Sequence, residues 1–194
     1  MVSDVTPETI KLRGGALCLD FANSVDWSQD GEPVRDEALT EPGALARWGR
    51  RMGIDGPDTG AAELAAALEL RAALYATFSA IARDQEPPAD ALDLLALDHA
   101  EAAAAGHLIA RDDAWRLEWP ADEPRRVRFA VVTDALALLA DPARLARVSR
   151  CPGRDCGWLF LDKSGRRHWC SMQTCGSRAK MRRMYARRRA AEKG

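Results

Sequence analysis

Four of the five cysteines stand in two pairs near the C-terminus of the 194-residue chain. Cys151 and Cys156 form the first pair and Cys170 and Cys175 the second, with four residues inside each pair and thirteen between the pairs. The fifth, Cys18, lies far away in an apolar stretch. Short loops can each place two thiolates on one tetrahedral zinc ion. The spacing therefore predicts one structural zinc ion held by four sulfur atoms, which leaves no ligand position open for a catalytic water.

Other uses of these cysteines fit the sequence less well. Two disulfides would need an oxidising compartment, whereas the first ten residues carry Asp4 and Glu8 instead of the basic start and apolar stretch of a secretion signal. Buried thiols without a metal would be unusual in so polar a segment. His168, two residues before Cys170, is the candidate replacement for a cysteine ligand, and only a site that lost one ligand could activate water.

A run of basic residues follows the last cysteine. After Gly176 no residue up to about Ala191 would break a helix, so the segment is predicted to be a helix whose first turn is fixed by the metal. Met181, Met184 and Tyr185 would share one stripe of this helix, and we expect the stripe to dock on the rest of the finger. The cations that flank the stripe are the candidate nucleic-acid-binding residues: Arg178, Lys180, Arg182, Arg183, Arg187, Arg188 and Arg189.

The charge of the chain is divided unevenly, although its formal net value is only −1. Residues 1–143 hold 13 basic and 26 acidic residues, whereas residues 144–194 hold 15 basic and 3 acidic residues. Clustered lysines and arginines replace the counterions of a phosphate backbone, so the C-terminal part is expected to bind nucleic acid. The same cations could instead keep the helix solvated, or could dock it on the acidic part and so inhibit DNA binding.

The elements that position these residues follow from periodicity and from turn residues. Apolar residues recur near the helical period in the N-terminal part, and Gly53, Gly106 and residues 85–88 interrupt the pattern. Helices are expected at residues 17–25, 41–52, 59–84, 89–105 and 123–147, the last with a bend at Asp141 and Pro142. Residues 107–119 alternate with period two, which predicts a hairpin that turns at Asp112 and Asp113.

A second hairpin is expected between the two cysteine pairs. Residues 158–162 alternate as a strand, and Lys163 to Gly165 should turn the chain back to a second strand at His168 and Trp169. A segment of about 40 residues rarely folds on a hydrophobic core alone, so zinc would supply the missing stability.

The predicted fold class is mainly α. A helical N-terminal domain with a small β-hairpin (residues 1–148) precedes a small α+β four-cysteine zinc finger made of a hairpin and a helix (residues 149–194). The composition, 47% hydrophobic and 29% charged, is that of a globular protein. No uncharged apolar run approaches the roughly 18 residues of a membrane helix, so we expect a cytoplasmic protein with no membrane partner.

Nothing in the N-terminal part has the spacing of a nucleotide loop or a catalytic triad, and we expect the protein not to be an enzyme. A small-molecule pocket between the helices is a further hypothesis, because polar and aromatic residues there could hold a ligand. The same residues could equally be caps, core residues and a solvated helix start. The candidates are Asp20, Asn23, Trp27 and Trp48, with the basic trio Arg125, Arg126 and Arg128.

Two segments carry a resemblance to a known family. Cys175, Gly176, Ser177 and Arg178 resemble the last motif of the bacterial CGNR zinc-finger proteins, with Ser177 where the family pattern has asparagine. Residues 19–24 resemble a recurrent segment of the helical ABATE domain that precedes the finger in that family. Serine and asparagine both cap helices, so the exchange leaves the expected fold intact and puts a base or phosphate contact by this side chain in doubt.

The resemblance implies a transcription regulator whose finger binds double-stranded DNA and whose N-terminal domain senses a stress-related ligand. The alternative is a zinc-stabilised protein-interaction or RNA-binding module, in which Trp158, Phe160 and Trp169 would form the contact face. The simpler role of these rings is to form the small core beside the metal.

Overall fold

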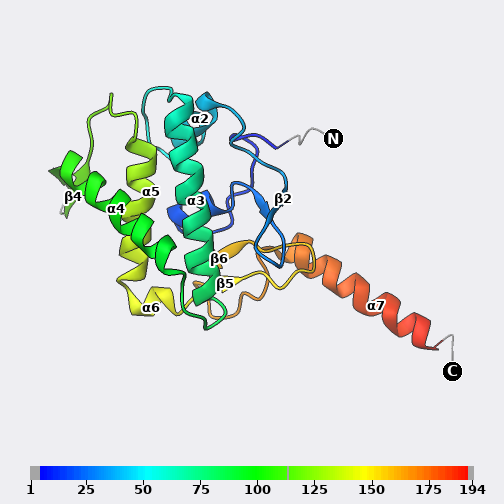
Figure 1. Cartoon of the computed structure of the whole chain (residues 1–194). Coiled ribbons are helices and arrows are strands. Elements are labelled where there is room, and N and C mark those ends of the chain that lie inside the picture. The colour runs from blue at the N-terminus through cyan, green and yellow to red at the C-terminus, as the bar shows by residue number, and fades with distance from the viewer. Residues whose placement is uncertain (1–4, 113, 192–194) are drawn as a thin grey trace.

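The computed structural model describes residues 5–112 and 114–191 (Figure 1). The part of the chain before β5 is called the body here, and the part from β5 onward is called the finger. The helices of the body are α1 (Leu17–Ala22), α2 (Pro42–Arg51), α3 (Ala61–Ile81), α4 (Ala89–Ala105), α5 (Arg126–Leu139) and the short α6 (Pro142–Leu145). Antiparallel pairs join β1 (Asp26–Trp27) to β2 (Pro33–Arg35), β3 (His107–Arg111) to β4 (Ala114–Glu118), and β5 (Val148–Arg150) to β6 (Leu159–Leu161). A π-helical turn, η1 (Met172–Gly176), leads into α7 (Ser177–Ala191). The predicted mainly α fold with small hairpins and a C-terminal four-cysteine cluster is confirmed.

The elements of the body lie close to their predicted positions. The predicted helix over residues 123–147 is divided into α5 and α6, and the carboxylate of Asp141 caps α6 by accepting the backbone N–H groups of Ala143 and Arg144 at 3.1 and 3.0 Å. β3 and β4 form the predicted hairpin, with Ala110 opposite Trp115. Asp113, placed in its turn by the sequence, lies outside the described residues.

Helix α3 is the central element of the core. By length and composition alone it could cross a membrane, with a mean hydropathy of 1.4, but 61% of its apolar stretch is buried inside the molecule. It packs against α1, α4 and α5, as Figure 1 shows. Arg71 is a buried charged residue of α3, and its guanidinium is neutralised by an ion pair with Glu37 at 2.6 Å.

The hydrophobic core continues from the body into the C-terminal part. Strand β6 is fully buried and packs against α1 and α3. The buried Asn23, directly after α1, joins the backbone of Leu159 by donating to its carbonyl oxygen at 2.8 Å and accepting its N–H at 2.9 Å. The N–H of Leu161 donates to the carbonyl oxygen of Gly14 at 2.7 Å. The first half of the finger is therefore built onto the body rather than beside it.

The predicted pairing of the finger hairpin is wrong. The strand over residues 158–162 is present as β6, but its partner is β5, which precedes the first cysteine, and not the segment at His168 and Trp169. Val148 lies opposite Leu161, and Arg150 lies opposite Leu159. The turn at Lys163 to Gly165 exists, but the chain after it runs without strand structure to the second cysteine pair. The loop between β5 and β6 is therefore the one that carries the first cysteine pair.

Helix α7 forms as predicted but does not dock. Figure 1 shows it extending away from the body, with its C-terminal end far from the other elements. The side chains of the expected docking stripe are exposed: Met181 by 44%, Met184 by 42% and Tyr185 by 54%. Ala179, in the first turn, is the one buried residue of the helix. The stripe finds no receiving surface, because the inner faces of β5 and β6 are already covered by α1 and α3.

Candidate metal centre and basic helix

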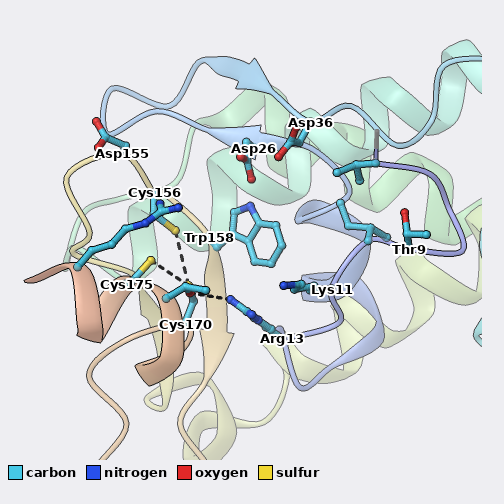
Figure 2. A pocket seen from close by; sticks show the side chains of 14 residues that line it. Thr9, Lys11, Arg13, Asp26, Asp36, Asp155, Cys156, Trp158, Cys170 and Cys175 are labelled. Carbon is cyan, nitrogen blue, oxygen red and sulfur yellow. Dashed lines mark hydrogen bonds between the residues drawn. The ribbon is translucent and has the colours of Figure 1, made fainter. Parts of the chain in front are cut away.

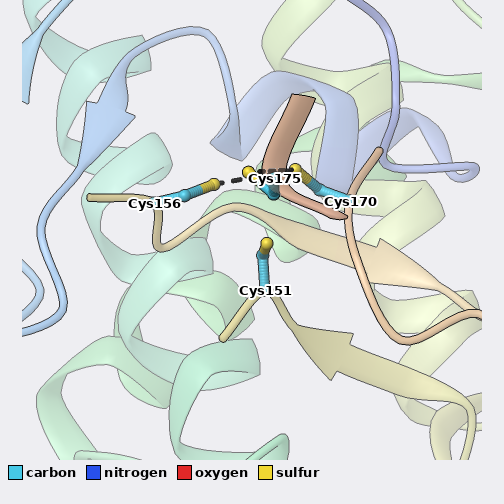
Figure 3. Close-up of side chains that lie close together, drawn as sticks. All are labelled: Cys151, Cys156, Cys170 and Cys175. Carbon is cyan, nitrogen blue, oxygen red and sulfur yellow. Dashed lines mark hydrogen bonds between the residues drawn. The ribbon is translucent and has the colours of Figure 1, made fainter. Parts of the chain in front are cut away.

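The four predicted ligands meet at one point. The sulfur atoms of Cys151, Cys156, Cys170 and Cys175 all lie within 4.8 Å of one another (Figure 3). The Sγ atom of Cys170 is 3.6 Å from that of Cys156 and 3.6 Å from that of Cys175. Four ligands at the usual Zn–S distance of about 2.3 Å stand about 3.8 Å apart at the corners of a tetrahedron. The cluster thus fits a single zinc ion, and its all-sulfur donor set is that of a structural site.

The electrostatics of the cluster also suit a dication. The Cys151 sulfur interacts with the Cys156 and Cys170 thiols, which lowers the pKa of Cys151 to about 2. The same contacts raise the pKa of Cys156 and bring the pKa of Cys170 to about 12. Neighbouring sulfurs therefore oppose the loss of further protons, and a bound zinc ion would supply the charge that lets all four be thiolates. Cys18 lies apart from this cluster, and burial raises the pKa of its thiol well above the usual range.

The first cysteine pair sits on a tight loop between β5 and β6. The N–H of Cys156 donates to the carbonyl oxygen of Gly153 at 3.0 Å, and the N–H of Cys151 donates to the carbonyl of Trp158 at 2.9 Å. A side chain at Gly153 would put its Cβ 3.2 Å from the Cys175 sulfur. At Gly157 it would lie 2.5 Å from the hydroxyl oxygen of Tyr75. Glycine at these positions allows the loop to approach both the ligand set and the body.

Side chains of the body and of β5 clamp this loop from outside. The amide nitrogen of Gln29, in the β1–β2 connection, donates to the carbonyl oxygens of Cys151, at 3.2 Å, Gly153, at 2.7 Å, and Cys156. The Tyr75 hydroxyl of α3 donates to the carbonyl oxygen of Gly157 at 3.0 Å. The guanidinium of Arg150, in β5, completes the clamp by donating to the Tyr75 hydroxyl at 3.1 Å and to the Gln29 backbone carbonyl oxygen at 2.6 Å.

This clamp cannot be recognised in the sequence. The clamp joins residues that are far apart in the sequence, because Gln29 and Tyr75 each lie more than 70 residues before Arg150. None of the three belongs to a motif. From the sequence alone, Arg150 is one of the 15 basic residues of the C-terminal part. No local pattern could have indicated these contacts, because they depend on where β5 lies against α3.

The second cysteine pair is held by fewer contacts. Arg167 donates to the carbonyl oxygens of Cys170 at 2.6 Å and of Arg13 at 2.8 Å, and it lies 4.4 Å over the Phe160 ring. Arg13 in turn donates to the hydroxyl of Thr174, in η1, at 2.9 Å. Cys175 is the second-last residue of η1, so the metal would fix the chain directly before α7.

The Cys175–Arg178 motif forms the junction between η1 and α7. A Cβ at Gly176 would lie 2.7 Å from the Met172 sulfur and 3.3 Å from the Trp169 ring, so a larger residue there would require the exposed Met172 side chain to move. Ser177, which stands where the family pattern has asparagine, donates to the carbonyl oxygen of Met172 at 3.0 Å. Its side chain thus bonds the backbone of η1.

The seven candidate nucleic-acid-binding cations all lie on α7. Their side chains are exposed, and none of them forms an ion pair within the described residues: Arg178, Lys180, Arg182, Arg183, Arg187, Arg188 and Arg189. The helix contains no acidic residue. Docking of this helix on the acidic body is not seen in the structure.

The predicted ligand-binding residues have structural partners and do not converge on one cavity. Asp20 accepts the N–H groups of Gly14 and Gly15 at 2.7 and 3.3 Å, and burial raises the pKa of its carboxyl. Asn23 holds β6, as described above. Trp48 is fully buried, and Trp27 stacks on the Tyr75 ring at 3.8 Å while its indole donates to a backbone carbonyl.

The basic trio is likewise engaged in the body. Arg125 pairs with Glu123 at 2.8 Å, and Arg126 donates to the carbonyl oxygen of Asp55 at 2.7 Å. Arg128 is buried between the carboxylates of Glu63 and Asp98. This buried ion-pair network links α5 to α3 and α4, and burial raises the pKa of both carboxyls despite the adjacent guanidinium.

The remaining candidates are placed as follows. His168 is outside the sulfur cluster and stands edge-on to the Trp169 ring at 4.8 Å. Phe160 is 1% exposed and Trp158 is 7% exposed, so these two rings belong to the core beside the metal. Trp169 is half-buried. An exposed aromatic contact face of all three rings is therefore absent.

Comparisons with known proteins cover nearly the whole chain. Residues 15–142 match the ABATE family model, which is described as "Putative stress-induced transcription regulator". Residues 147–188 match the CGNR zinc finger model. No curated protein matches the chain.

Proposed function

The chain belongs to the ABATE family and ends in a CGNR zinc finger, and from this premise we propose that it is a transcription regulator that binds double-stranded DNA through α7. The proposal rests on the exposure and the positive charge of α7. Its seven cations project from the body with no acidic residue beside them on the helix and no ion pair to the described residues. A helix of this kind is suited to replace the counterions of a phosphate backbone.

The shape of the finger supports a groove contact in addition to phosphate contacts. An α-helix fits the major groove of B-form DNA, and α7 is attached to the molecule only at its first turn. The exposed Met181, Met184 and Tyr185 offer apolar surface between the arginines, which is suited to thymine methyl groups. Arginine is the residue that most often recognises guanine, so some of the seven cations would read bases and the others would hold phosphates.

The acidic body restricts which part of the molecule can approach DNA. With twice as many acidic as basic residues in 1–143, the body is repelled by the same phosphates that attract α7. The role of the zinc ion in this function is structural, because it holds η1 and thereby the start of α7. A regulator of this kind needs reduced cysteines and access to DNA, so we propose that it works in the cytoplasm.

The test is duplex binding by the full-length, zinc-loaded protein, followed by fluorescence anisotropy of a labelled mixed-sequence duplex. Arg183→Gln on α7 should weaken binding and lower the slope of log K against log salt by about 0.9, the effect of one lost phosphate contact. Arg116→Gln is the matched control, because Arg116 is an exposed arginine of β4, at the other end of the molecule, and forms no ion pair with the residues that the structure describes. No saturable binding with zinc present, or equal effects of the two substitutions, would contradict the proposal.

The second candidate function is an RNA-binding module, which the same cations would serve. Competition decides between the two. We expect unlabelled duplex DNA to displace the labelled duplex at lower concentration than single-stranded or double-stranded RNA of equal length. RNA has a deep and narrow major groove that side chains cannot read, so a better RNA competitor would assign α7 to single strands or to RNA backbones instead.

A further inference from the structure

The four cysteines of the metal centre differ in their access to solvent. Cys151 is 0% exposed, and Cys170 and Cys175 are 4% and 6% exposed. Cys156 is the one half-buried member of the cluster. We propose that Cys156 is an oxidation site at which hydrogen peroxide reacts first, and that a disulfide to Cys170 then expels the zinc ion. This inference concerns the metal centre and does not depend on DNA binding.

A cleft beside the centre gives a small oxidant access to the sulfurs. It has a volume of about 290 Å³, and Cys156, Cys170 and Cys175 line it (Figure 2). Hydrogen peroxide is hardly larger than water, so a cleft of this size admits it. The reactive form of a cysteine is the thiolate, and a sulfur that binds zinc is a thiolate at neutral pH.

Cysteines that sense oxidants are accessible thiolates with a second cysteine close by. Cys156 meets both conditions. Cys18 provides the contrast within the same chain, because it is 0% exposed and burial raises the pKa of its thiol well above the usual range. We therefore expect oxidation to begin in the cluster and to leave Cys18 reduced.

Cys170 is in position to form the disulfide with Cys156. Their Sγ atoms are 3.6 Å apart and have to approach to about 2 Å (Figure 3). The clamp holds the backbone at Cys156, because the amide nitrogen of Gln29 donates to the carbonyl oxygens of Gly153 and Cys156. Cys170 lies outside any strand or helix, and Arg167 donates to its carbonyl oxygen. Most of the movement should therefore come from Cys170.

The proposed oxidation has two steps. The Cys156 thiolate attacks one oxygen of hydrogen peroxide, so that an S–O bond forms, the O–O bond breaks and hydroxide leaves, which yields a sulfenic acid. The Cys170 thiolate then attacks the sulfenic sulfur, so that the S–S bond forms, the S–O bond breaks and a second hydroxide leaves. The two sulfurs together lose two electrons, and the peroxide takes them up.

The disulfide changes the attachment of α7. Only Cys151 and Cys175 would remain as zinc ligands, and a structural site needs four, so the ion dissociates. Cys175 lies in η1 and would no longer hold the start of α7, whereas the loop between β5 and β6 stays clamped to the body. Reduction of the disulfide and return of zinc would reverse the change, as is typical of transient disulfides in a reducing compartment.

Two other results are conceivable for such a cluster. The Sγ atom of Cys175 is also 3.6 Å from that of Cys170, so a disulfide within the second pair would need the same approach. Both of these residues are buried, which favours Cys156 as the first to react. A centre with a purely structural role would instead keep its zinc until the chain unfolds.

The experiment maps the oxidised cysteines of the full-length, zinc-loaded protein. After treatment with hydrogen peroxide, the remaining thiols are blocked with N-ethylmaleimide and the chain is digested with trypsin, which cuts after lysine and arginine. Zinc release to a chelating dye and the helical circular dichroism are followed in parallel. The peptides separate the cysteines as follows: residues 151–154 carry Cys151, residues 155–163 carry Cys156, and residues 168–178 carry Cys170 and Cys175.

We expect the first product to join residues 155–163 to residues 168–178, with the maleimide on Cys175 and one zinc ion released per disulfide. The circular dichroism of the helices in the body should be retained. A first disulfide within residues 168–178, or one that includes Cys151, would overturn the proposal. Oxidation of Cys18 at the same rate, or zinc retained until the helices unfold, would also overturn it.

A histidine ligand gives a variant that keeps the metal. Histidine replaces cysteine in many structural zinc sites but forms no disulfide. Cys156→His should hold one zinc ion per chain and release it to hydrogen peroxide about tenfold more slowly, because the reacting thiolate is gone. Cys18→Ala, the control outside the cluster, should release zinc at the wild-type rate. Equal rates in wild type and Cys156→His would contradict the proposal, and the wild-type peptide map decides the question if that variant does not hold zinc.

Discussion

Different interactions stabilise the body and the C-terminal finger. In the body, large apolar side chains such as Phe21, Phe78 and Phe129 are completely buried among α1, α3 and α5. In the finger, apolar packing ends at Ala179, and α7 beyond it contacts solvent on all sides. The body is thus stabilised by burial of apolar surface, whereas the second half of the finger depends on the zinc ion and a few hydrogen bonds.

Because of this difference, the two regions can be altered independently. The loop of the first cysteine pair is clamped by Gln29, Tyr75 and Arg150, so we expect it to stay folded as long as the body does. The second pair and α7 are joined to the body by Arg13 and Arg167 and, above all, by the metal. Loss of zinc should therefore release α7 without unfolding the body.

Removal of the metal has the largest expected effect. In Cys170→Ser, one of four ligands is lost, and zinc binding to such sites is worth on the order of 10 kcal/mol. We expect no bound zinc by native mass spectrometry, with loss of hydrogen-exchange protection over residues 167–180 and unchanged protection in α3 and α5. Because protons compete for the thiolates, the wild-type protein should also release zinc as the pH falls.

Cys18→Ala is the control for that experiment, because Cys18 is buried in the body and lies outside the sulfur cluster. It should retain one zinc ion per chain despite a loss of core packing. Parallel loss of protection in α3 and in the finger on zinc removal would show that the two regions are one cooperative unit.

The buried Arg128 tests the stability of the body alone. Arg128→Met leaves Glu63 and Asp98 buried without a cation, which should lower the free energy of unfolding by about 3–5 kcal/mol in urea titrations. Arg126→Met, at a half-buried neighbour with no ion pair to the described residues, should cost far less. Both variants should keep their zinc, and a variant of Arg128 that lost zinc while the body stayed folded would contradict the division into two regions.

The deficit of Arg128→Met should depend on pH in a defined direction. Burial already raises the pKa of Glu63 and of Asp98, and removal of the cation raises both further. The folded state then binds more protons than the unfolded state, so stability is lost as the pH rises through the raised pKa values. The deficit should be largest near neutral pH and shrink as the pH falls toward about 4, the range of unfolded carboxyls.

The clamp gives the smallest of these effects and joins the two regions. Tyr75→Phe keeps the stacking on Trp27 but removes the hydroxyl that bonds Gly157 and Arg150. We expect a loss of about 1–3 kcal/mol in the free energy of unfolding and faster release of zinc to a chelating dye. Tyr185→Phe, on the exposed part of α7, should change neither quantity. An unchanged rate of zinc release in Tyr75→Phe would mean that the clamp does not support the metal centre.

The sequence was sufficient for the parts of the molecule that depend on local pattern. Periodic apolar residues located the helices of the body, and the spacing of the four cysteines located the sulfur cluster, because ligand spacing on short loops reflects the geometry of the ion. The segment after Gly176 lacks helix breakers up to Ala191, and α7 covers the same residues.

The parts that failed depend on contacts between distant segments. β5 is only three residues long, Val148–Arg150, and has no alternation that distinguishes it from the end of a helix, so its pairing with β6 was not predictable. The stripe of Met181, Met184 and Tyr185 has helical spacing, but spacing cannot show that β6 is already covered by the body. Asp20 and Asn23 are polar residues in an apolar region, a pattern that also fits ligand binding, but in the structure their side chains bond backbone groups.

The most direct test of the account is the salt dependence of duplex binding with and without α7. A chain ending at Gly176 keeps all four cysteines and the clamp, so it should still bind one zinc ion. Each phosphate contact made by a cation of α7 should add about −0.9 to the slope of log K against log salt, so the slope of the full-length protein should lie between about −1 and −6. The shortened chain should show almost no binding and a slope near zero. If the two proteins bind duplex DNA with the same affinity and slope, α7 is not the DNA-binding element.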